Sequence, residues 1–490
     1  MKKNSDGLKK NFFYQTVYEL LLILLPLLTS PYIARVLGAE KLGIYSLSYA
    51  IAYYFQLFAA LGIKYHGTRT IASVKDNQEE LNKKYSEILA FHILFSIICI
   101  ILYIVYLLVF VKSNFIISLI QILNVFAIMV DVSWFFFGME KFKLSTTINS
   151  IIRIITVILI FILVKEKADL WKYTLIMSSG IFLGQLSLWI YIPKYVKFVK
   201  PKLRNVLHHC KPMFILFLPI LAVSLFRYMD KIMLGFITNK IQVGLYENAD
   251  KVINMPMTVI ISFSTVMLPR ITTLISTGNK ERSEYYTTLS YRYMELIAIG
   301  MCFGLYCVAD LFSLIFWGEE FISCGILIKI LAFTIPFSTY SCIMRTQYLM
   351  PHKKDKIYVR SMLYGGVLNL ILNYILINLY SGVGAAIATF VSEIFVMIVQ
   401  MIATKNKLPH TKYIKSFLMF IIFGMFMSII IYFIDLSLTA SVLSLLIEIT
   451  IGAIIYCSLS IIYLFVVKDD LLLKYTNKIF KKGGKYEYKR

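Results

Sequence analysis

Long uncharged apolar runs dominate the chain, and they recur at the length needed to cross a bilayer. Three of them, Phe91–Val111, Tyr173–Pro193 and Ser416–Ile434, contain no Asp, Glu, Lys or Arg. A helix needs roughly 20 apolar residues to span the hydrocarbon core. The uncharged run Ser361–Ser392 is too long for one crossing, and the stretch Asn378–Gly384 within it predicts a tight turn. Because the runs are continuous rather than alternating, they predict helices and not barrel strands.

This pattern predicts an all-α polytopic membrane protein with about fourteen transmembrane helices. The expected spans lie near residues 12–36, 42–63, 86–111, 114–137, 144–164, 172–192, 212–237, 244–269, 289–316, 321–349, 357–379, 383–403, 416–434 and 441–467. The apolar run that follows Lys9 and Lys10 is too long for the core of a cleavable signal peptide, so we expect it to be the first span.

A short motif occurs twice in the same direction, with both copies at the start of an apolar run. The first copy is Gly43-Ile44-Tyr45, and Arg69 follows its tyrosine by 24 residues. The second copy, Gly244-Leu245-Tyr246, begins 201 residues later, and Arg270 again follows by 24 residues. Equal spacing in two membrane halves is typical of transporters that are built from a parallel repeat.

The repeat predicts three regions. Residues 1–200 form an N-terminal lobe with helices 1–6, and residues 201–404 form a second lobe with helices 7–12. Residues 405–490 contain helices 13 and 14 and a basic tail. Six is an even number, so both lobes enter the membrane from the same face. We therefore expect a pseudo-two-fold axis along the membrane normal and a cleft between the lobes.

The charge of the chain fits this topology. Hydrophobic residues make up 59% of the 490 residues, and the formal net charge is +23. Of the 50 Lys and Arg residues, 36 fall on the side that carries both termini, and 7 fall in the opposite loops. Positively charged loops stay in the cytoplasm, so both termini are predicted to be cytoplasmic. Since topology accounts for the basic residues, we expect no nucleic-acid partner.

Several function classes lack their sequence signals. The predicted outer loops do not exceed about fifteen residues, and the chain has no phosphate loop, nucleotide-binding fingerprint or paired acidic loop motif. We therefore expect no catalytic residues and no cofactor, and active transport would be driven by an ion gradient or a substrate gradient. The seven cysteines form no CxxC pair, and His208-His209-Cys210 stands in a basic loop without further ligands, so no metal site is expected.

The densest group of charges within the predicted spans lies in helices 7 and 8. Arg227, Lys231 and Lys251 are candidates to bind a phosphate or diphosphate in a low-dielectric cleft. Asp230 is a candidate coupling carboxylate that titrates or holds a cation, and the alternative is that it pairs with Lys231 or Lys251. Asn254 belongs to a polar stripe on helix 8 that must face a cavity or a neighbouring helix.

Other polar residues within spans divide between cavity and packing roles. Glu19 and Glu393 lie deep in helices 1 and 12 and are further candidates for coupling. Asp131 is expected to pair with Arg153.

Two closely spaced pairs are expected to serve packing. Arg292 and Glu295, three residues apart, are expected to pair with each other. Asn369 and Asn373 are expected to form hydrogen bonds between helices.

Several segments, in order along nearly the whole chain, together resemble one family. They are Ser30–Gly38 with Gly43–Tyr45, Trp134–Lys141, Asp230–Gly235, Val243–Tyr246, Lys251, Leu268–Arg270, Asn369, Asn373, Gly384–Ala386 and Glu393. This set resembles the bacterial O-antigen and capsule repeat-unit flippases (Wzx type) of the multidrug/oligosaccharidyl-lipid/polysaccharide exporter superfamily. Phe137 stands where many members have glutamine, so no polar role is expected there.

The resemblance implies a fold and a function. The fold would be MATE-like, with two six-helix lobes and two extra helices. The function would be to carry undecaprenyl-diphosphate-linked oligosaccharides to the outer leaflet of the bacterial plasma membrane by alternating access, coupled to H⁺ or Na⁺. Arg35, in the first-loop segment, joins the candidate substrate-binding residues. We expect a functional monomer that works beside a polysaccharide polymerase and glycosyltransferases.

Three alternatives stay open. A peptidoglycan-precursor flippase would share the fold, and so would a drug or cation antiporter of the same superfamily. A polysaccharide polymerase is also a membrane protein with many spans, but it is an enzyme and would need a large outer loop.

Overall fold

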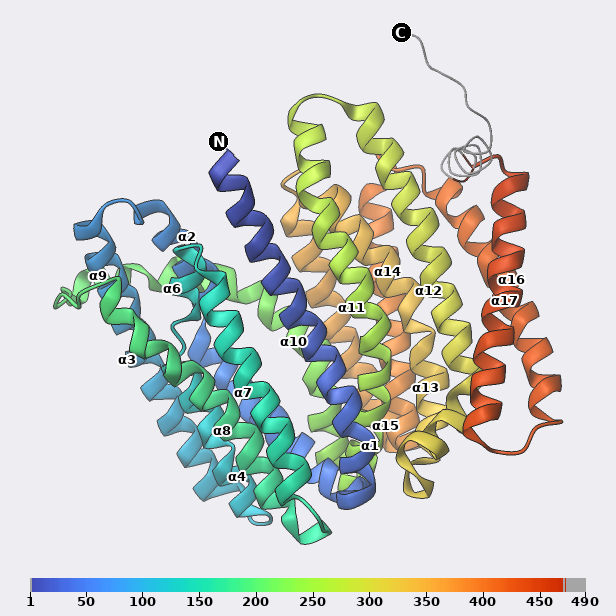
Figure 1. Ribbon diagram of the computed structural model, residues 1–490, viewed down its shortest axis with the longest axis horizontal. Helices are drawn as coiled ribbons and strands as arrows, with labels where there is room; N and C mark the ends of the chain where they lie inside the picture. Colours follow the sequence, from blue (N-terminus) through green and yellow to red (C-terminus); the bar gives the residue numbers. More distant parts are fainter. Residues whose placement is uncertain (1, 470–471, 473–490) are drawn as a thin grey trace. The chain divides into compact units, whose positions relative to one another are not determined.

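The computed structural model describes residues 2–469 and 472, with side chains described from residue 24 onwards, and its elements are helical (Figure 1). The longer helices are α1 (Lys2–Ala60), α2 (Ile63–Val74), α3 (Gln78–Phe110), α7 (Phe142–Leu163), α8 (Leu170–Leu188), α10 (Cys210–Ile237), α11 (Lys240–Ser276), α12 (Lys280–Trp317), α14 (Thr334–Met344), α15 (Asp355–Thr404), α16 (His410–Asp435) and α17 (Val442–Val466). The shorter ones are α4 (Phe115–Ile120), α5 (Ile122–Met129), α6 (Ser133–Gly138), η1 (Lys167–Asp169), η2 (Trp189–Lys194), α9 (Leu203–His208), η3 (Glu319–Phe321), α13 (Cys324–Ala332) and the π-helical turn η4 (Arg345–Leu349).

Twelve helical segments of the described residues are long and apolar enough to cross a membrane. An all-helical membrane protein is therefore confirmed. Two of the twelve segments, of 51 and 50 residues, each contain a non-helical residue inside one long helix, Gly38 in α1 (φ 77°, ψ 171°) and Ser381 in α15 (φ 52°, ψ −127°).

The chain reverses direction at the interruption in α15. A Cβ added to Gly384 would lie 2.0 Å from the carbonyl oxygen of Leu376, eight residues earlier. In an unbroken helix eight residues are separated by about 12 Å. The two halves of α15 therefore form a helical hairpin around Ser381, and the turn predicted at Asn378–Gly384 is confirmed.

Two spans that the sequence predicted as continuous helices are segmented. The span at 114–137 is divided into α4, α5 and α6. The division before α6 has a local cause, because the Asp131 carboxylate accepts a hydrogen bond from the Ser133 amide at 2.8 Å. Aspartate competes in this way for backbone donors and ends a helical segment. The span at 321–349 is likewise divided into α13, α14 and the π-helical turn η4.

The chain contains two compact units, which we describe separately. The first comprises the residues up to 251 together with 316–323 and 359–392. In it α1 packs against α3, α5, α7 and α10, and α7 and α8 lie side by side (Figure 1). Its core is aromatic: Trp134, Phe135 and Phe136 of α6 are fully buried, and a Cβ on Gly67 of α2 would lie 2.6 Å from the Trp134 ring.

The second unit comprises residues 252–315, 324–358 and those from 393 onwards. Its helices α16 and α17 pack side by side (Figure 1). Small residues permit close helix approach: a Cβ on Gly424 would lie 2.2 Å from the Phe303 ring, and one on Gly300 would lie 2.7 Å from the Tyr456 ring. The two units are defined by contacts in the structure and do not coincide with the two copies of the sequence repeat. The lobe boundaries near residues 200 and 404 therefore stay a prediction.

Candidate functional site

The two copies of the repeated motif touch each other in the first unit. A Cβ on Gly43 would lie 1.6 Å from the carbonyl oxygen of Lys240, and one on Gly244 would lie 2.0 Å from the carbonyl oxygen of Ala39. Both pairs obey the repeat, because Ala39 and Lys240 are 201 residues apart, as are Gly43 and Gly244. Each copy therefore makes the same contact with the other, as expected around a local two-fold axis. Only glycine permits backbones to approach this closely.

Asp230 lies beside this contact, at the centre of a buried hydrogen-bond network. Its carboxylate accepts from the Tyr246 hydroxyl (2.7 Å), the Thr389 hydroxyl (2.7 Å) and the Asn373 amide (2.6 Å). Asn373 also donates to Asn369 at 3.0 Å. The network joins α10, α11 and α15, so the predicted role of the two asparagines in helix–helix hydrogen bonding is confirmed. The alternative that Asp230 pairs with Lys231 or Lys251 is wrong, because three neutral donors occupy the carboxylate.

Lys231 points into a second network, which is ionic. Its ammonium lies 2.6 Å from Glu247 and 2.9 Å from Asp250, and its side chain is 6% exposed. Lys251 shares Glu247, at 3.4 Å, and keeps 36% of its side chain exposed. Helix periodicity explains the arrangement, since Glu247, Asp250 and Lys251 occupy one face of α11 at spacings of three and four. The Lys231 charge is thus neutralised within the protein, whereas Lys251 stays accessible.

Two arginines and a group of tyrosines lie next to the ionic network. The Tyr228 ring stacks on Tyr53, with centroids 3.9 Å apart, and the Arg227 guanidinium lies 5.9 Å from the Tyr228 centroid. Arg153 of α7 and Arg227 of α10 both lie within electrostatic range of the Tyr49 hydroxyl. Arg227, predicted from sequence, and Arg153 therefore act on the same tyrosine.

Two ion pairs expected from the sequence form differently. Asp131 does not pair with Arg153, because the carboxylate ends a helical segment at Ser133. Arg292 does not pair with Glu295: it binds Asp469, whose carboxylate also accepts from Tyr293 at 2.7 Å. Asp469 is far from Arg292 along the chain, so spacing within one helix could not predict that pair, whereas the partner of Asp131 is local.

The contacts described above do not include the remaining candidates, and one of them has no described side chain. Arg35 is exposed, three residues before the interruption at Gly38. Asn254 and Glu393 belong to the second unit, where Glu393 is half-buried and hydrogen-bonded to Ser338. The side chain of Glu19 lies outside the described residues, as does the basic tail from residue 473.

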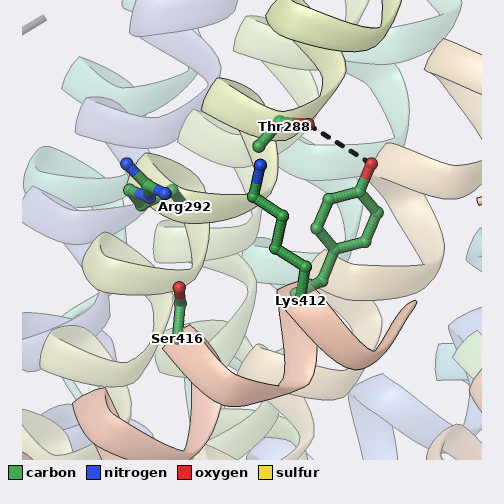
Figure 2. Close-up of a pocket in the computed structure, with 5 residues that line it drawn as sticks. Thr288, Arg292, Lys412 and Ser416 are labelled. Atoms are coloured by element: carbon green, nitrogen blue, oxygen red, sulfur yellow. Dashed lines mark hydrogen bonds between the residues drawn. The ribbon is translucent and has the colours of Figure 1, made fainter. Parts of the chain in front are cut away.

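Neither of two cavities in the structure is lined by a predicted site residue. The first is lined by Thr288, Arg292, Lys412, Tyr413 and Ser416, and its volume is about 10 Å³. Figure 2 shows this pocket, with the Thr288 hydroxyl 3.5 Å from that of Tyr413. It has room for about one water molecule and is too small for a diphosphate. The second is an open groove between α2 and α10, beside His66 and Arg69.

Sequence reasoning missed the tyrosines. Tyr45, Tyr49 and Tyr53 recur every four residues and so occupy one face of α1. This signal was present in the sequence, but tyrosine at helical spacing in a membrane span is equally typical of packing. In the structure charged side chains lie near these rings, with the Lys231 ammonium 5.4 Å from the Tyr228 centroid.

Comparisons with known proteins agree with the fold and indicate the family. The family model described as "Polysaccharide biosynthesis protein" matches residues 8–275. A protein of Shigella dysenteriae described as an O-antigen transporter is 27% identical over 81% of this chain and 100% of its own length. The capsular polysaccharide biosynthesis protein CapF of Staphylococcus aureus is 26% identical over 79% of this chain and 97% of its own length.

Among solved structures, the lipid II flippase MurJ in an inward closed conformation superposes with a TM-score of 0.73 at 18% identity, covering 93% of this chain and 99% of MurJ. An inward-facing multidrug resistance MATE family transporter of the MOP superfamily gives a TM-score of 0.60 at 13% identity, over 80% and 97%. At these identities the likeness shows the fold, which is MurJ- and MATE-like. The homologues are transporters and flippases and not enzymes, as the sequence predicted. With more than half of its length matched, the chain belongs to the polysaccharide biosynthesis protein family.

Proposed function

We propose that this protein carries polyprenyl-diphosphate-linked oligosaccharides from the cytoplasmic to the outer leaflet of the bacterial plasma membrane during surface polysaccharide synthesis. The relative described as an O-antigen transporter and the capsular biosynthesis relative support this class of substrate. The mechanism is alternating access in a fold of fourteen crossings, since two of the twelve apolar segments are interrupted. Two six-helix lobes, two extra helices and cytoplasmic termini complete the proposal.

The observation that carries the proposal is a pair of arginines inside the spans. In the described part of the chain no ion pair is formed by Arg153 or Arg227, although Asp250, which pairs with Lys231, also acts electrostatically on Arg227, and both arginines act on Tyr49. A charged side chain within a membrane is costly, and such residues mark substrate pathways. Guanidinium groups bind phosphate through paired hydrogen bonds. The two arginines, with the accessible Lys251, suit a diphosphate in a cavity that excludes the polyprenyl tail.

The roles of the other candidates follow from their surroundings. Lys231 orients Glu247 and Asp250 and acts on the substrate through these two carboxylates. Arg35 and Asn254 contact the substrate at other stages of transport. Asp230 is the proposed coupling carboxylate, and Glu19 and Glu393 are secondary candidates. When a proton or Na⁺ binds Asp230, at least one of its three hydrogen bonds must change, so ion binding alters the packing of α10, α11 and α15.

The decisive experiment uses a deletion strain complemented with variants. Arg153→Ala/Arg227→Ala should abolish surface polysaccharide while the protein stays at normal abundance in the membrane, and complete lipid-linked repeat units should accumulate in the cytoplasmic leaflet. Arg204→Ala is the matched control, because Arg204 is exposed on the short helix α9. It should behave like the wild type.

Three outcomes would contradict the proposal. Normal polysaccharide in the double variant would remove the arginines from the site. Repeat units that reach the outer leaflet unpolymerised in the deletion strain would indicate a polymerase. Unchanged polysaccharide in that strain would favour a drug or cation antiporter.

A further inference from the structure

A row of tyrosines lines one face of α1 in the first unit. Tyr45, Tyr49 and Tyr53 are four residues apart, so the row extends over about 12 Å along the helix. Rings from two other helices extend it sideways: Tyr173 of α8 lies 4.8 Å from Tyr45, and Tyr228 of α10 lies 3.9 Å from Tyr53, between ring centroids. All but Tyr173 are half-buried.

The hydroxyls of this row differ from those of neighbouring tyrosines. Tyr54, on another face of α1, donates to the Ser224 carbonyl at 3.2 Å, and Tyr103 donates to the Ser118 carbonyl at 2.6 Å. Among the described residues no hydrogen bond is formed by the hydroxyls of Tyr45, Tyr49 or Tyr53, and none of these atoms is buried without a partner. Phenol groups that are both accessible and unbonded keep their hydrogen-bonding capacity for a partner from outside the chain.

The surroundings of the row are charged on both sides. Arg153 and Arg227 lie within electrostatic range of Tyr49, and the Lys231 ammonium lies 5.4 Å from the Tyr228 centroid. Glu247 also lies within electrostatic range of Tyr45 and Tyr49. Donors, acceptors and ring surfaces therefore meet in one place.

We infer that this tyrosine row (Tyr45, Tyr49, Tyr53 and Tyr228) binds the oligosaccharide part of the substrate, while Arg153 and Arg227 bind its diphosphate. The inference rests on the proposed function and deepens it. The apolar C–H face of a sugar ring packs on an aromatic ring, and its hydroxyls exchange hydrogen bonds with phenols and carboxylates. A row of similar groups repeated along 12 Å of helix, about the rise of eight residues, suits a short chain of sugars. The row discriminates little between different sugars, because each tyrosine offers the same ring surface and hydroxyl.

The test compares two lipid probes on purified protein in nanodiscs. One probe is the lipid-linked repeat unit extracted from the deletion strain, and the other is polyprenyl diphosphate without sugar. Tyr53→Ala/Tyr228→Ala should weaken binding of the repeat-unit lipid about tenfold, the change that corresponds to about 1.4 kcal/mol. It should leave binding of the sugar-free lipid within about twofold, which also shows that the variant is folded.

Two further variants sharpen the comparison. Tyr53→Phe keeps the ring and loses the hydroxyl, so it should lose less affinity for the repeat-unit lipid than the double alanine variant. Tyr374→Ala is the matched control, because Tyr374 is 68% exposed on α15. It should bind both probes like the wild type.

The outcomes separate this inference from the proposed function. Equal weakening of both probes by the double alanine variant, or no weakening of either, would overturn the tyrosine assignment. If Arg153→Ala/Arg227→Ala in the same experiment weakens binding of both probes, the proposed function stands and only the tyrosine assignment is wrong. A wild-type protein that binds neither lipid would overturn both.

Discussion

The contact between the two motif copies gives the sharpest structural prediction. Replacing Gly43 with alanine adds one methyl group to a helix whose conformation alanine readily adopts. That methyl would lie 1.6 Å from the carbonyl oxygen of Lys240 and 3.0 Å from the Gly244 nitrogen. A carbon and a carbonyl oxygen approach to roughly 3.3 Å at closest. The start of α11 must therefore move away from α1 by more than 1 Å, since no flexible side chain can absorb the clash.

The expected cost follows from two opposing effects. Overpacking a close contact costs about 1–3 kcal/mol, and a backbone clash belongs at the upper end. Alanine recovers about 1 kcal/mol through its better helix propensity than glycine. The net loss of about 1–2 kcal/mol changes the equilibrium between closed and open contact by roughly 5- to 30-fold.

Hydrogen exchange measures this equilibrium locally. Peptides that cover residues 38–48 and 240–250 should exchange roughly 5 to 30 times faster in Gly43→Ala than in the wild type. Gly244→Ala should act alike, because its added methyl would lie 2.0 Å from the Ala39 carbonyl oxygen. Gly304→Ala is the matched control: nothing lies within 4 Å of the added atom, so exchange at both peptides should not change.

Unchanged exchange at both peptides in Gly43→Ala would refute the reasoning. The contact would then be absent from the resting protein, and the equal spacing of the motif copies would have no structural meaning.

Three further predictions concern the charged groups. Asp230→Ala leaves three buried donors without their acceptor and should lower the free energy of unfolding by about 3 kcal/mol, with a smaller loss for Asp230→Asn, measured by thermal unfolding in detergent. Lys231→Met leaves Glu247 and Asp250 without their shared cation and should lower the free energy of unfolding by about 3–5 kcal/mol. The additional change Glu247→Gln should restore part of this loss. Wild-type stability of Lys231→Met would show that the ion pairs do not stabilise the fold. The hydrogen bond from Lys167 lowers the pKa of Glu320. The ion pair therefore stabilises the fold above the ordinary carboxyl pKa, and this stabilisation is lost as the pH falls through the pKa of Glu320 in the folded protein. Glu320→Gln should therefore melt earlier at neutral pH by an amount worth less than about 1 kcal/mol, because the carboxylate is 54% exposed, and this difference should vanish in acid; a difference that persists there would have another cause.

The fold was largely predictable because the membrane imposes it. Backbone groups in hydrocarbon must bond within their own segment, so an uncharged run such as Phe91–Val111 is expected to be helical, and α3 contains this run up to Phe110. The hairpin at Ser381 was predictable for the same reason, since the run Ser361–Ser392 would extend about 48 Å as one helix, well beyond the roughly 30 Å hydrocarbon core. The segmentation of 114–137 was not, because it depends on one carboxylate hydrogen bond at Asp131 that competes with a strongly apolar context.

The site was only partly predictable. Sequence periodicity placed Asp230, Lys231 and Lys251 on helix faces, but it could not say which neighbour each would meet. The donors to Asp230 come from α11 and α15, up to 159 residues away. Arg153 was assigned to Asp131 because both are charged in adjacent spans, and only the fold shows that the carboxylate is occupied by Ser133. The long-range hydrogen bonds to Asp230 have no signature in a single sequence, whereas the bond between Ser133 and Asp131 joins residues two positions apart.

The two motif copies differ in one respect that bears on mechanism. The residue sixteen positions before the motif tyrosine is Asp230 in the second copy and Thr29 in the first. Asp230 binds the Tyr246 hydroxyl, whereas Thr29 bonds to the Leu25 carbonyl of its own helix at 3.1 Å and leaves Tyr45 without a carboxylate partner sixteen residues upstream. The same tyrosine thus fastens three helices in one copy and lines the tyrosine row in the other. When one motif copy holds the packing and the other presents a hydroxyl, the pair can keep its symmetric Gly43–Gly244 contact and still bind an asymmetric substrate. Thr29→Asp should then draw the Tyr45 hydroxyl into a hydrogen bond. The variant should bind the repeat-unit lipid more weakly than the wild type and the sugar-free lipid equally well. If the variant binds each of the two probes as tightly as the wild type does, the difference between the motif copies has no role in recognition.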